Sequence, residues 1–226
     1  ARKIHISGEN ADMKKFLLGS GGNPKHAASH ITTSTSAKFL DDQATGNSGG
    51  ITINTETLII ENKGSIFSET TTPGKGGSID ISARNITFLS EASLSAMSRF
   101  SSLAGKAGNI TISAAEKIKM EKASVLTSSE QARGGDIFLE ANSMKLTGNT
   151  NISAQSAGKG NAGNLHLEGK HDFSMGNSFL YTKAAKADGG NIKVLADYIV
   201  HLIDSEISAS VGRSEERRVG KECATG

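Results

Sequence analysis

Apolar and polar residues alternate in short clusters along most of the chain, and the clusters recur at a nearly fixed distance. In the unit from Gly134 to Ala162, apolar side chains occupy every second position within each of three clusters. Successive side chains of a β-strand point to opposite faces, so this period predicts strands with one face in a core. The residues expected to point outward are Asp136, Phe138, Glu140 and Ser153.

The first apolar pair of this unit occurs six times. The pairs are Ile51/Ile53, Ile79/Ile81, Ile110/Ile112, Ile137/Leu139, Leu165/Leu167 and Ile192/Val194. Their first members lie 28, 31, 27, 28 and 27 residues apart, and the longest step contains an extended turn from Ala96 to Ala107. A chance alternation would not recur at a fixed period, so the sequence predicts a solenoid in which each coil stacks on its neighbours.

Two further apolar clusters follow the first pair in each repeat. The second strand is expected at Leu58/Ile60, Ile86/Phe88, Ile118/Met120, Met144/Leu146 and Phe173/Met175, with a less regular copy at Tyr198–Leu202. The third is expected to begin at Ser65-Ile66, Ser93-Leu94, Ser124-Val125, Asn151-Ile152, Ser178-Phe179 and Glu206-Ile207. Three short strands in a coil of about 28 residues predict an all-β fold, a right-handed single-stranded parallel β-helix of six regular coils, because parallel crossovers are overwhelmingly right-handed.

Small residues occupy two positions of every repeat. The glycines before the first strand, where a tight bend needs a positive φ or a close backbone approach, are Gly50, Gly77, Gly108, Gly135, Gly163 and Gly190. The residues at the next corner, where a large side chain would collide with its copies one coil away, are Thr55, Ala83, Ala114, Ala141, Gly169 and Ala196.

The repeat divides the chain into three parts. Residues 49–211 are predicted to form the β-helix, and residues 1–48 an irregular first coil. In that coil, Lys3–Ser7 is interpreted as a first strand, Met13–Leu18 as a second and His30–Thr33 as a third. Since residue 1 is not Met and no signal sequence is evident, the chain is expected to begin inside a longer protein.

Residues 212–226 break every column of the repeat and are predicted to be non-native or disordered. The stretch Arg213–Cys223, RSEERRVGKEC, packs seven charged residues into eleven and contains the only cysteine. It resembles the in-frame translation of a common sequencing-library adapter. The alternative is a natural charged tail or the start of a helix. Without this stretch the chain has no cysteine, which excludes a disulfide framework or a thiol nucleophile.

The stretch Gly76–Ala96, GGSIDISARNITFLSEASLSA, resembles the repeats of filamentous haemagglutinin-like exoproteins of Gram-negative bacteria. The glycine pair, both apolar pairs and the small corner residues agree together, and the resemblance extends over about residues 46–211. It implies a secreted, surface-associated right-handed β-helix that serves as the shaft of a large adhesin. It also implies two-partner secretion through an outer-membrane transporter.

Composition and charge agree with a rod and disfavour other classes. The chain has 226 residues with 26 Gly, no Trp and 36% hydrophobic residues, which is little core-forming bulk for a globular domain of this size. Its net charge of +2 combines both signs and does not favour nucleic acid or an acidic membrane. No apolar run approaches the roughly 20 residues of a transmembrane helix.

Residues one period apart are neighbours on a solenoid, so any chemistry must be sought in columns. The outward column of the first strand contains Thr52, Asp80, Thr111, Phe138, His166 and Lys193, and nothing in it repeats. Polysaccharide lyases and hydrolases need clustered acids with a basic partner, and Asp80 is expected to lie between threonines. Asp136 falls in a separate column with Asn109, Asn164 and Asn191, which is interpreted as a turn ladder rather than a metal site.

The remaining candidate sites favour structural interpretations. Asp41-Asp42 lies in a loop where two carboxylates could contact calcium, but a flexible solvated loop is the more common explanation. His26 and His30 have a zinc-ligand spacing without a nearby third ligand, and His166 with His171 is a similarly incomplete pair. Gly158–Gly163 lacks the Lys-Ser/Thr of a phosphate loop and is expected to be a turn.

The sequence therefore favours a non-catalytic structural shaft of a secreted, cell-surface adhesin, with no cofactor and no metal. The best candidate binding turn is Met97–Gly105, the longest insertion, which carries Arg99 and Phe100 on a variable loop. Its partner would be a receptor or glycan on a host or neighbouring cell. The alternative is a carbohydrate-active β-helix enzyme. An ice-binding solenoid is disfavoured because no Thr-x-Thr column repeats over successive coils.

Overall fold

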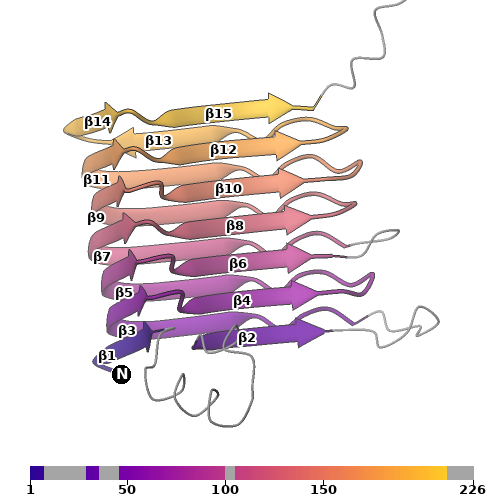
Figure 1. Cartoon of the computed structure of the whole chain (residues 1–226), viewed down its shortest axis with the longest axis horizontal. Helices are drawn as coiled ribbons and strands as arrows, with labels where there is room; N and C mark the ends of the chain where they lie inside the picture. The colour runs from indigo at the N-terminus through magenta and orange to yellow at the C-terminus, as the bar shows by residue number, and fades with distance from the viewer. Residues whose placement is uncertain (8–28, 36–45, 100–104, 213–226) are drawn as a thin grey trace, which may run out of the picture.

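The computed structural model describes residues 1–7, 29–35, 46–99 and 105–212. These residues form strands and no helix, arranged in two parallel sheets that face each other across a single core (Figure 1). The first sheet contains β1 (Lys3–Ser7), β3 (Ile51–Glu61), β5 (Ile79–Leu89), β7 (Ile110–Glu121), β9 (Ile137–Thr147), β11 (Leu165–Gly176), β13 (Ile192–Ala196) and β14 (Ile199–Ile203). The second contains β2 (His30–Thr35), β4 (Ser65–Thr70), β6 (Ser93–Ser98), β8 (Ser124–Ser129), β10 (Asn151–Ser156), β12 (Phe179–Ala184) and β15 (Glu206–Val211).

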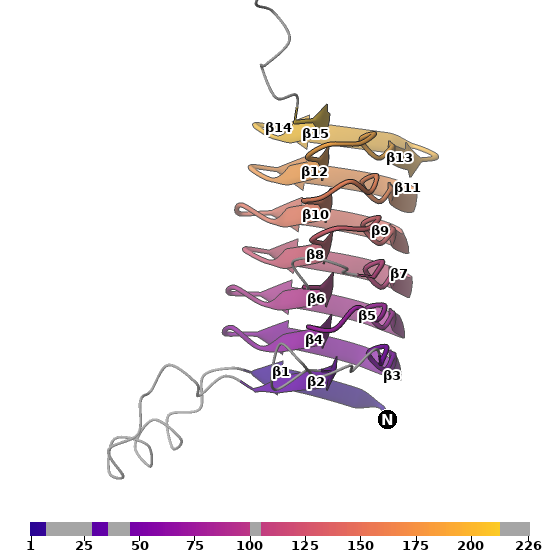
Figure 2. The same ribbon diagram turned by 90° about the vertical axis from the view of Figure 1, so that its right-hand side faces the viewer.

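Each strand pairs with its equivalent one coil away, so the predicted parallel β-helix with a period of about 28 residues is confirmed. Ile79 pairs in register with Ile51 on one side and with Ile110 on the other. Ile137 continues the same column. The coils stack into a rod whose axis is perpendicular to the strands, as the two side views show (Figures 1 and 2).

The first two predicted strands of each coil run on as one long bent strand in most of the solenoid. β3, β5, β7, β9 and β11 each span both, and only the last coil divides them into β13 and β14. The bend lies at the predicted small-residue corner, where the register shifts after Ala83, Ala114 and Gly169. A small residue lets the backbone turn there without losing its main-chain hydrogen bonds to the coils above and below.

Two of the long strands carry one extra residue at this bend. In β5 one residue separates Ala83 from Asn85, whereas in β7 two residues separate their register partners, Ala114 and Lys117. Two residues also separate Gly169 from Asp172 in β11. The result is a β-bulge in β7 and in β11, a device that adds one unpaired residue and bends the strand. The periodicity of the apolar pairs gave no sign of these bulges, because the extra residue falls between two clusters.

The inward side chains form one continuous apolar core. All of the predicted first-strand and second-strand pairs from the first to the fifth regular coil are buried, and so are Ile66, Leu94, Val125 and Ile152 of the third strand. The alternation of buried and outward positions is strict in β4, β6 and β8. Burial of each such aliphatic side chain contributes about 1.5–3 kcal/mol.

Hydroxyl groups occupy part of the interior near the glycine turns. Thr127 and Thr182 are fully buried, and their Oγ1 atoms donate hydrogen bonds to the carbonyl oxygens of Gly135 (2.5 Å) and Gly190 (2.9 Å). Two coils before Thr127 in the same column, the hydroxyl of Ser68 donates to the carbonyl of Gly49 and accepts from the amide of Gly77. Buried hydroxyls need such partners, and here they satisfy the backbone at the turn.

The glycine column is explained by close backbone approach rather than by positive φ. A Cβ built on Gly135 would overlap the carbonyl oxygen of Gly108, and one on Gly108 would overlap the carbonyl of Gly77. No other residue fits at these positions, because consecutive turns stack with their main chains in direct contact. The sequence left a positive φ and a close backbone approach as alternatives, and the structure shows the close approach.

One register prediction for the third strand was wrong, and one residue differs from its predicted exposure. Phe179, not Ser178, pairs with Asn151, and Leu180 takes the inward position beside Ile152. Phe179 is consequently an outward residue with 38% exposure. Ser153 has the predicted outward direction but is buried, because Leu126 and Tyr181 occupy the adjacent register positions and flank its small side chain.

The N-terminal coil also differs from its predicted order. β1 pairs with β3 through Ile4 and Leu58, so Lys3–Ser7 is a second strand and not a first one. β2 pairs with β4, which confirms His30–Thr33 as part of a third strand. Met13–Leu18, predicted as the second strand, lies outside the described residues. Both strands extend the regular sheets, although they fall before the boundary predicted at residue 48.

Candidate functional site

A ladder of polar side chains follows the turn before the first strand. The amide of Asp136 donates to the Asn109 side chain (2.9 Å), and the amide of Asn164 donates to Asp136 (2.8 Å). The amide of Asn191 continues the row by donating to Asn164 (2.9 Å). Asp136 Oδ1 also accepts from Arg133 at 2.6 Å. Oδ1 of this carboxylate therefore links stacked turns, as the turn-ladder interpretation predicted.

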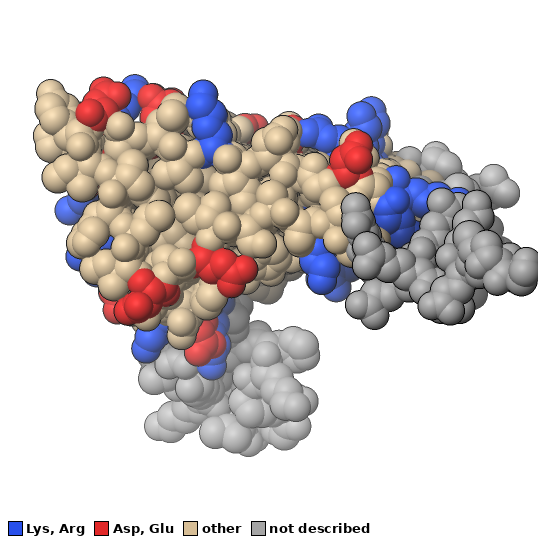
Figure 3. Space-filling model, turned by 90° about the horizontal axis from the view of Figure 1, so that it is seen from above, with Lys and Arg blue, Asp and Glu red and all other residues tan. Residues whose placement is uncertain are grey.

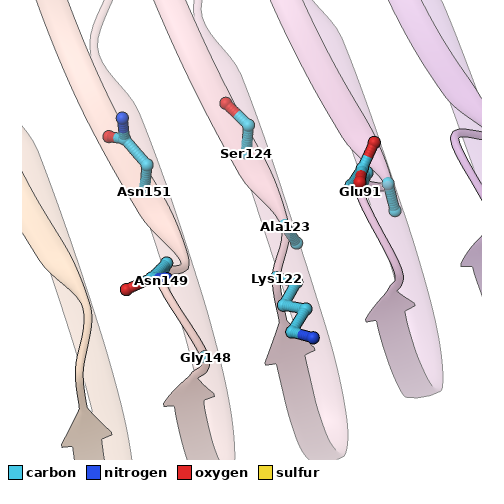
Figure 4. A pocket seen from close by; sticks show the side chains of 8 residues that line it. Glu91, Lys122, Ala123, Ser124, Gly148, Asn149 and Asn151 are labelled. Carbon is cyan, nitrogen blue, oxygen red and sulfur yellow. The ribbon is translucent and has the colours of Figure 1, made fainter.

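A groove follows the opposite corner, where the long strand turns into the second sheet. It has a volume of about 400 Å³ and is lined by residues of three successive coils, among them Glu91, Lys122, Ser124, Asn149 and Asn151 (Figure 4). A second hollow of about 220 Å³ adjoins it and shares Glu91 and Lys122. The groove therefore runs along the solenoid axis and is not confined to one coil.

The corner groove owes its shape to left-handed backbone. Asn62, Ser90, Lys122, Asn149 and Asn177 all have φ between 46° and 67°. Asn tolerates this conformation better than most residues, whereas Lys and Ser occupy it at a small energetic cost. The groove contains one carboxylate, Glu91, beside lysine, which is not the paired-acid arrangement that general acid–base hydrolysis requires.

Among the described residues, two acids lie side by side on the outer face of the first sheet. Glu140 and Glu168 are register partners on β9 and β11, and the bulge residue Lys170 forms an ion pair with Glu140. The hydrogen bond from Lys170 to Glu140, and then the attraction of Glu140 and Glu168, raise the pKa of Lys170 above its ordinary value of 10.5. This cluster is exposed to solvent, where ion pairs contribute little.

Three of the described histidines stack on an aromatic ring or contact an acid. His166 stacks on Phe138 with ring centroids 4.8 Å apart, and His171 stacks on Tyr198 at 4.6 Å. His5 lies 2.7 Å from Glu61. Among the described residues, no three His, Cys, Asp or Glu side chains gather as metal ligands would. His26 and the Asp41-Asp42 pair lie outside those residues.

The structure places part of the predicted binding turn. Arg99 is exposed, and its Nε lies 3.1 Å from Glu69 Oε1 on the preceding coil. Its Nη2 contacts the sulfur of Met97 at 3.2 Å, so the guanidinium lies back along the sheet. Phe100 lies outside the described residues. Asp80 is exposed between Thr52 and Thr111, as predicted, and no second acid faces it in its column.

Sequence reasoning missed the Glu140, Glu168 and Lys170 cluster and the corner groove. Glu140 and Glu168 belong to the outward column two residues after the column of Phe138 and His166, so the same 28-residue spacing finds them. Lys170, which pairs with Glu140, lies in the bulge, and the apolar period did not indicate that bulge. The groove depends on residues with a left-handed backbone conformation. The recurrent asparagines Asn62, Asn149 and Asn177 were the sequence signal for this conformation.

Comparison of the chain with known protein families, with curated proteins and with solved structures finds no match. Within the described ranges, no helix has the length and apolar character needed to span a membrane. The class of protein that the fold defines is a parallel β-helix repeat protein.

Proposed function

We propose that this chain is a non-catalytic shaft segment of a large secreted bacterial surface adhesin of the haemagglutinin-like exoprotein kind. One observation supports this most. Positions inside the solenoid keep their residue type from coil to coil, whereas the outward column of Thr52, Asp80, Thr111, Phe138, His166 and Lys193 changes at each step. A protein whose function is to extend and space binding sites needs regular stacking and no fixed surface chemistry.

The same proposal assigns the partners and location. An outer-membrane transporter would secrete the chain as part of an exoprotein, and the rod would lie outside the cell, attached to its surface. Binding to a receptor or glycan would then be spread over the outer face and the variable turns. Arg99 and Phe100 remain the proposed contact residues, because their turn is the longest in the repeat.

A carbohydrate-active enzyme is the second candidate, and the cluster of Glu140, Glu168 and Lys170 favours it. Two carboxyl groups on neighbouring strands with a cationic neighbour are the elements of an acid–base pair. Against this, Lys170 is already paired with Glu140, and the face is open. An open face does not exclude water from a reacting bond, and it holds a substrate by one side only.

Incubation with pectin, alginate and related polysaccharides, with and without calcium, separates the two candidates. The shaft proposal expects no shortening of any polymer. Reproducible cleavage that is lost in Glu168→Gln or Glu140→Gln, or in Asp80→Ala or Asp136→Ala, would reject it and establish the enzyme. Thr111→Val is a matched control on the same face, because it removes a polar group outside the acid cluster.

A further inference from the structure

The corner groove exists because one corner of the rod is shorter than the corners on either side of it. Lys122 and Ala123 alone connect β7 to β8, whereas three residues, 90–92 and 148–150, connect the equivalent strands of the neighbouring coils. No other two-residue corner in the described coils lies between two longer ones. Lys122 and Ala123 are therefore set back between Glu91 of the preceding coil and Asn149 of the following coil (Figure 4).

The polar side chains that line this groove are mostly not used by the fold. Those that make no hydrogen bond or ion pair with any described residue are Glu91, Lys122, Ser124 and Asn149. In the two coils that follow, the corner serines Ser178 and Ser205 instead donate to main-chain carbonyls at 2.9 and 2.7 Å. The donors and acceptors of the groove are therefore open to a ligand. Its volume of about 400 Å³ lies within the ordinary range for ligand sites.

The groove continues onto the outer face of the second sheet through Asn151. Nδ2 of Asn151 donates to the hydroxyl of Tyr181 at 3.4 Å, and Nε2 of Gln155 donates to the same hydroxyl at 3.0 Å. The Tyr181 hydroxyl thus accepts two hydrogen bonds and donates none to a described residue, so its hydrogen is available to a ligand. Two neighbours already hold the phenol in place, which lowers the entropic cost of binding.

The second sheet is uncharged beside the groove. The nine outward positions of β6, β8 and β10 hold five Ser with one Asn, one Gln, one Leu and one Met. On the strands that flank this region, charge returns at Glu69 of β4 and Lys183 of β12. Both signs also lie around the outline of the last coil, seen along the rod axis (Figure 3). The absence of charge is therefore a property of this part of the surface and not of the whole rod.

These features favour a ligand that is uncharged and rich in hydroxyl groups. Polyanions such as nucleic acids bind through clustered cations, whereas the groove sets one lysine, Lys122, against one acid, Glu91. The cores of protein interfaces are enriched in aromatic residues and Arg and depleted in Ser, which is the reverse of this face. Sugar hydroxyls both donate and accept hydrogen bonds, as do the Ser hydroxyls and the Asn and Gln amides here.

We propose that the corner groove and the adjoining face of β8, β10 and β12 bind a neutral glycan, a polymer of uncharged hexoses. One sugar unit occupies the recess at Lys122 and Ala123, and the chain continues over Asn151 toward Tyr181. This inference rests on the proposed adhesive function, because it names the kind of ligand that the rod holds. It adds a second contact region to the turn that carries Arg99.

Binding of the full chain to polysaccharides immobilised on a sensor surface tests the site. The probes are dextran, glycogen, mannan and galactan, each beside its sulfated form. We expect at least one neutral polymer to bind, and its sulfated form to bind more weakly. Asn149→Ala and Tyr181→Phe should each weaken this binding about three- to tenfold, as the loss of one hydrogen bond does.

Asn177→Ala is the matched control, because Asn177 has the same left-handed conformation one coil further on but does not line the groove. It should leave binding unchanged, and circular dichroism checks that all variants keep the β-fold. An equal loss in Asn177→Ala would overturn the inference.

Three other results would also overturn it: no neutral polymer binds, the sulfated form binds equally well, or Arg99→Ala abolishes binding while Asn149→Ala and Tyr181→Phe do not weaken it. The shaft proposal would stand after each of these results. Cleavage of a bound polymer rejects the shaft instead, and weaker binding by the two groove variants would still support this site.

Discussion

Adjacent residues of one strand show how differently the two faces of this solenoid are constrained. Leu139 points inward, is fully buried and lies between Ile112 and Leu167, which are aliphatic as well. Phe138 points outward and lies between Thr111 and His166. The interior must fit the same neighbours in every coil, whereas the outer face is free to vary. This contrast is what we expect of a rod whose function depends on stacking.

The largest effect is expected from a change inside the core. Leu139→Ala removes a fully buried side chain and should lower the free energy of unfolding by about 2–5 kcal/mol. Its neighbour on the opposite face is the control: Phe138→Ala loses the stack on His166, which is worth about 0.5–1.5 kcal/mol, together with the partial burial of the ring. Urea unfolding measures both. Equal losses would mean that the two faces are not energetically distinct.

A somewhat smaller effect is expected where backbones touch. In Gly135→Ala the new methyl group overlaps the carbonyl oxygen of Gly108, which must move. Overpacking of this kind costs about 1–3 kcal/mol. Gly176→Ala is the matched control, because its Cβ would lie 3.9 Å from Thr147 in ordinary contact. Thermal denaturation should separate the two variants, and a stable Gly135→Ala would show that the turns can move apart at little cost.

The buried hydroxyls give an intermediate test. Thr127→Val keeps the shape of the side chain but leaves the Gly135 carbonyl without its 2.5 Å hydrogen bond. An unsatisfied buried acceptor costs about 1–3 kcal/mol. Thr111→Val, on the outer face of the first sheet, should change stability by less than about 0.5 kcal/mol. If urea unfolding gives the same midpoint for Thr127→Val and Thr111→Val, the buried hydrogen bond does not contribute the expected stability.

The smallest effect concerns the outer face and depends on pH. Hydrogen bonds from Asn85 and then Arg84 lower the pKa of Glu116 below its ordinary value of 4.5. A lowered folded-state pKa stabilises the fold above the unfolded pKa, and this contribution is lost as the pH falls through the folded value. Glu116→Gln should therefore make the loss of stability below pH 4.5 slightly shallower. An unchanged acid profile would show that these contacts do not persist in solution.

Much of the fold was predictable because it follows from a repeated two-residue alternation. The inward pairs at Ile79/Ile81 and Ile110/Ile112 and the glycine before each of them were found from spacing alone, and all lie as predicted. The prediction failed where the repeat weakens. The third strand of the fifth coil was predicted to start at Ser178-Phe179, one residue too early. The error arose because Phe179 and Leu180 are both apolar, so either could take the first inward position.

The surface was less predictable for a physical reason. Outward side chains contact whatever the adjacent coils present, so their arrangement depends on register and bulges rather than on burial. Glu140 and Lys170 illustrate this, since the lysine that pairs with the acid lies in a one-residue bulge. Lys3–Ser7 was assigned to the wrong strand of its coil because the first two strands share the same alternation.

The central claim is that stacking between neighbouring coils, and no single coil, carries the structure and the function of this chain. Deletion of one complete coil, residues 137–164, tests it most directly. β7 and β11 would then become neighbours, and both contain the extra bulge residue, so they match without a register shift. We predict a folded rod with unchanged β-type circular dichroism, shorter by about 4.8 Å in small-angle scattering. An unfolded or aggregated product would contradict the account, because it would show that the deleted coil performs a role its neighbours cannot.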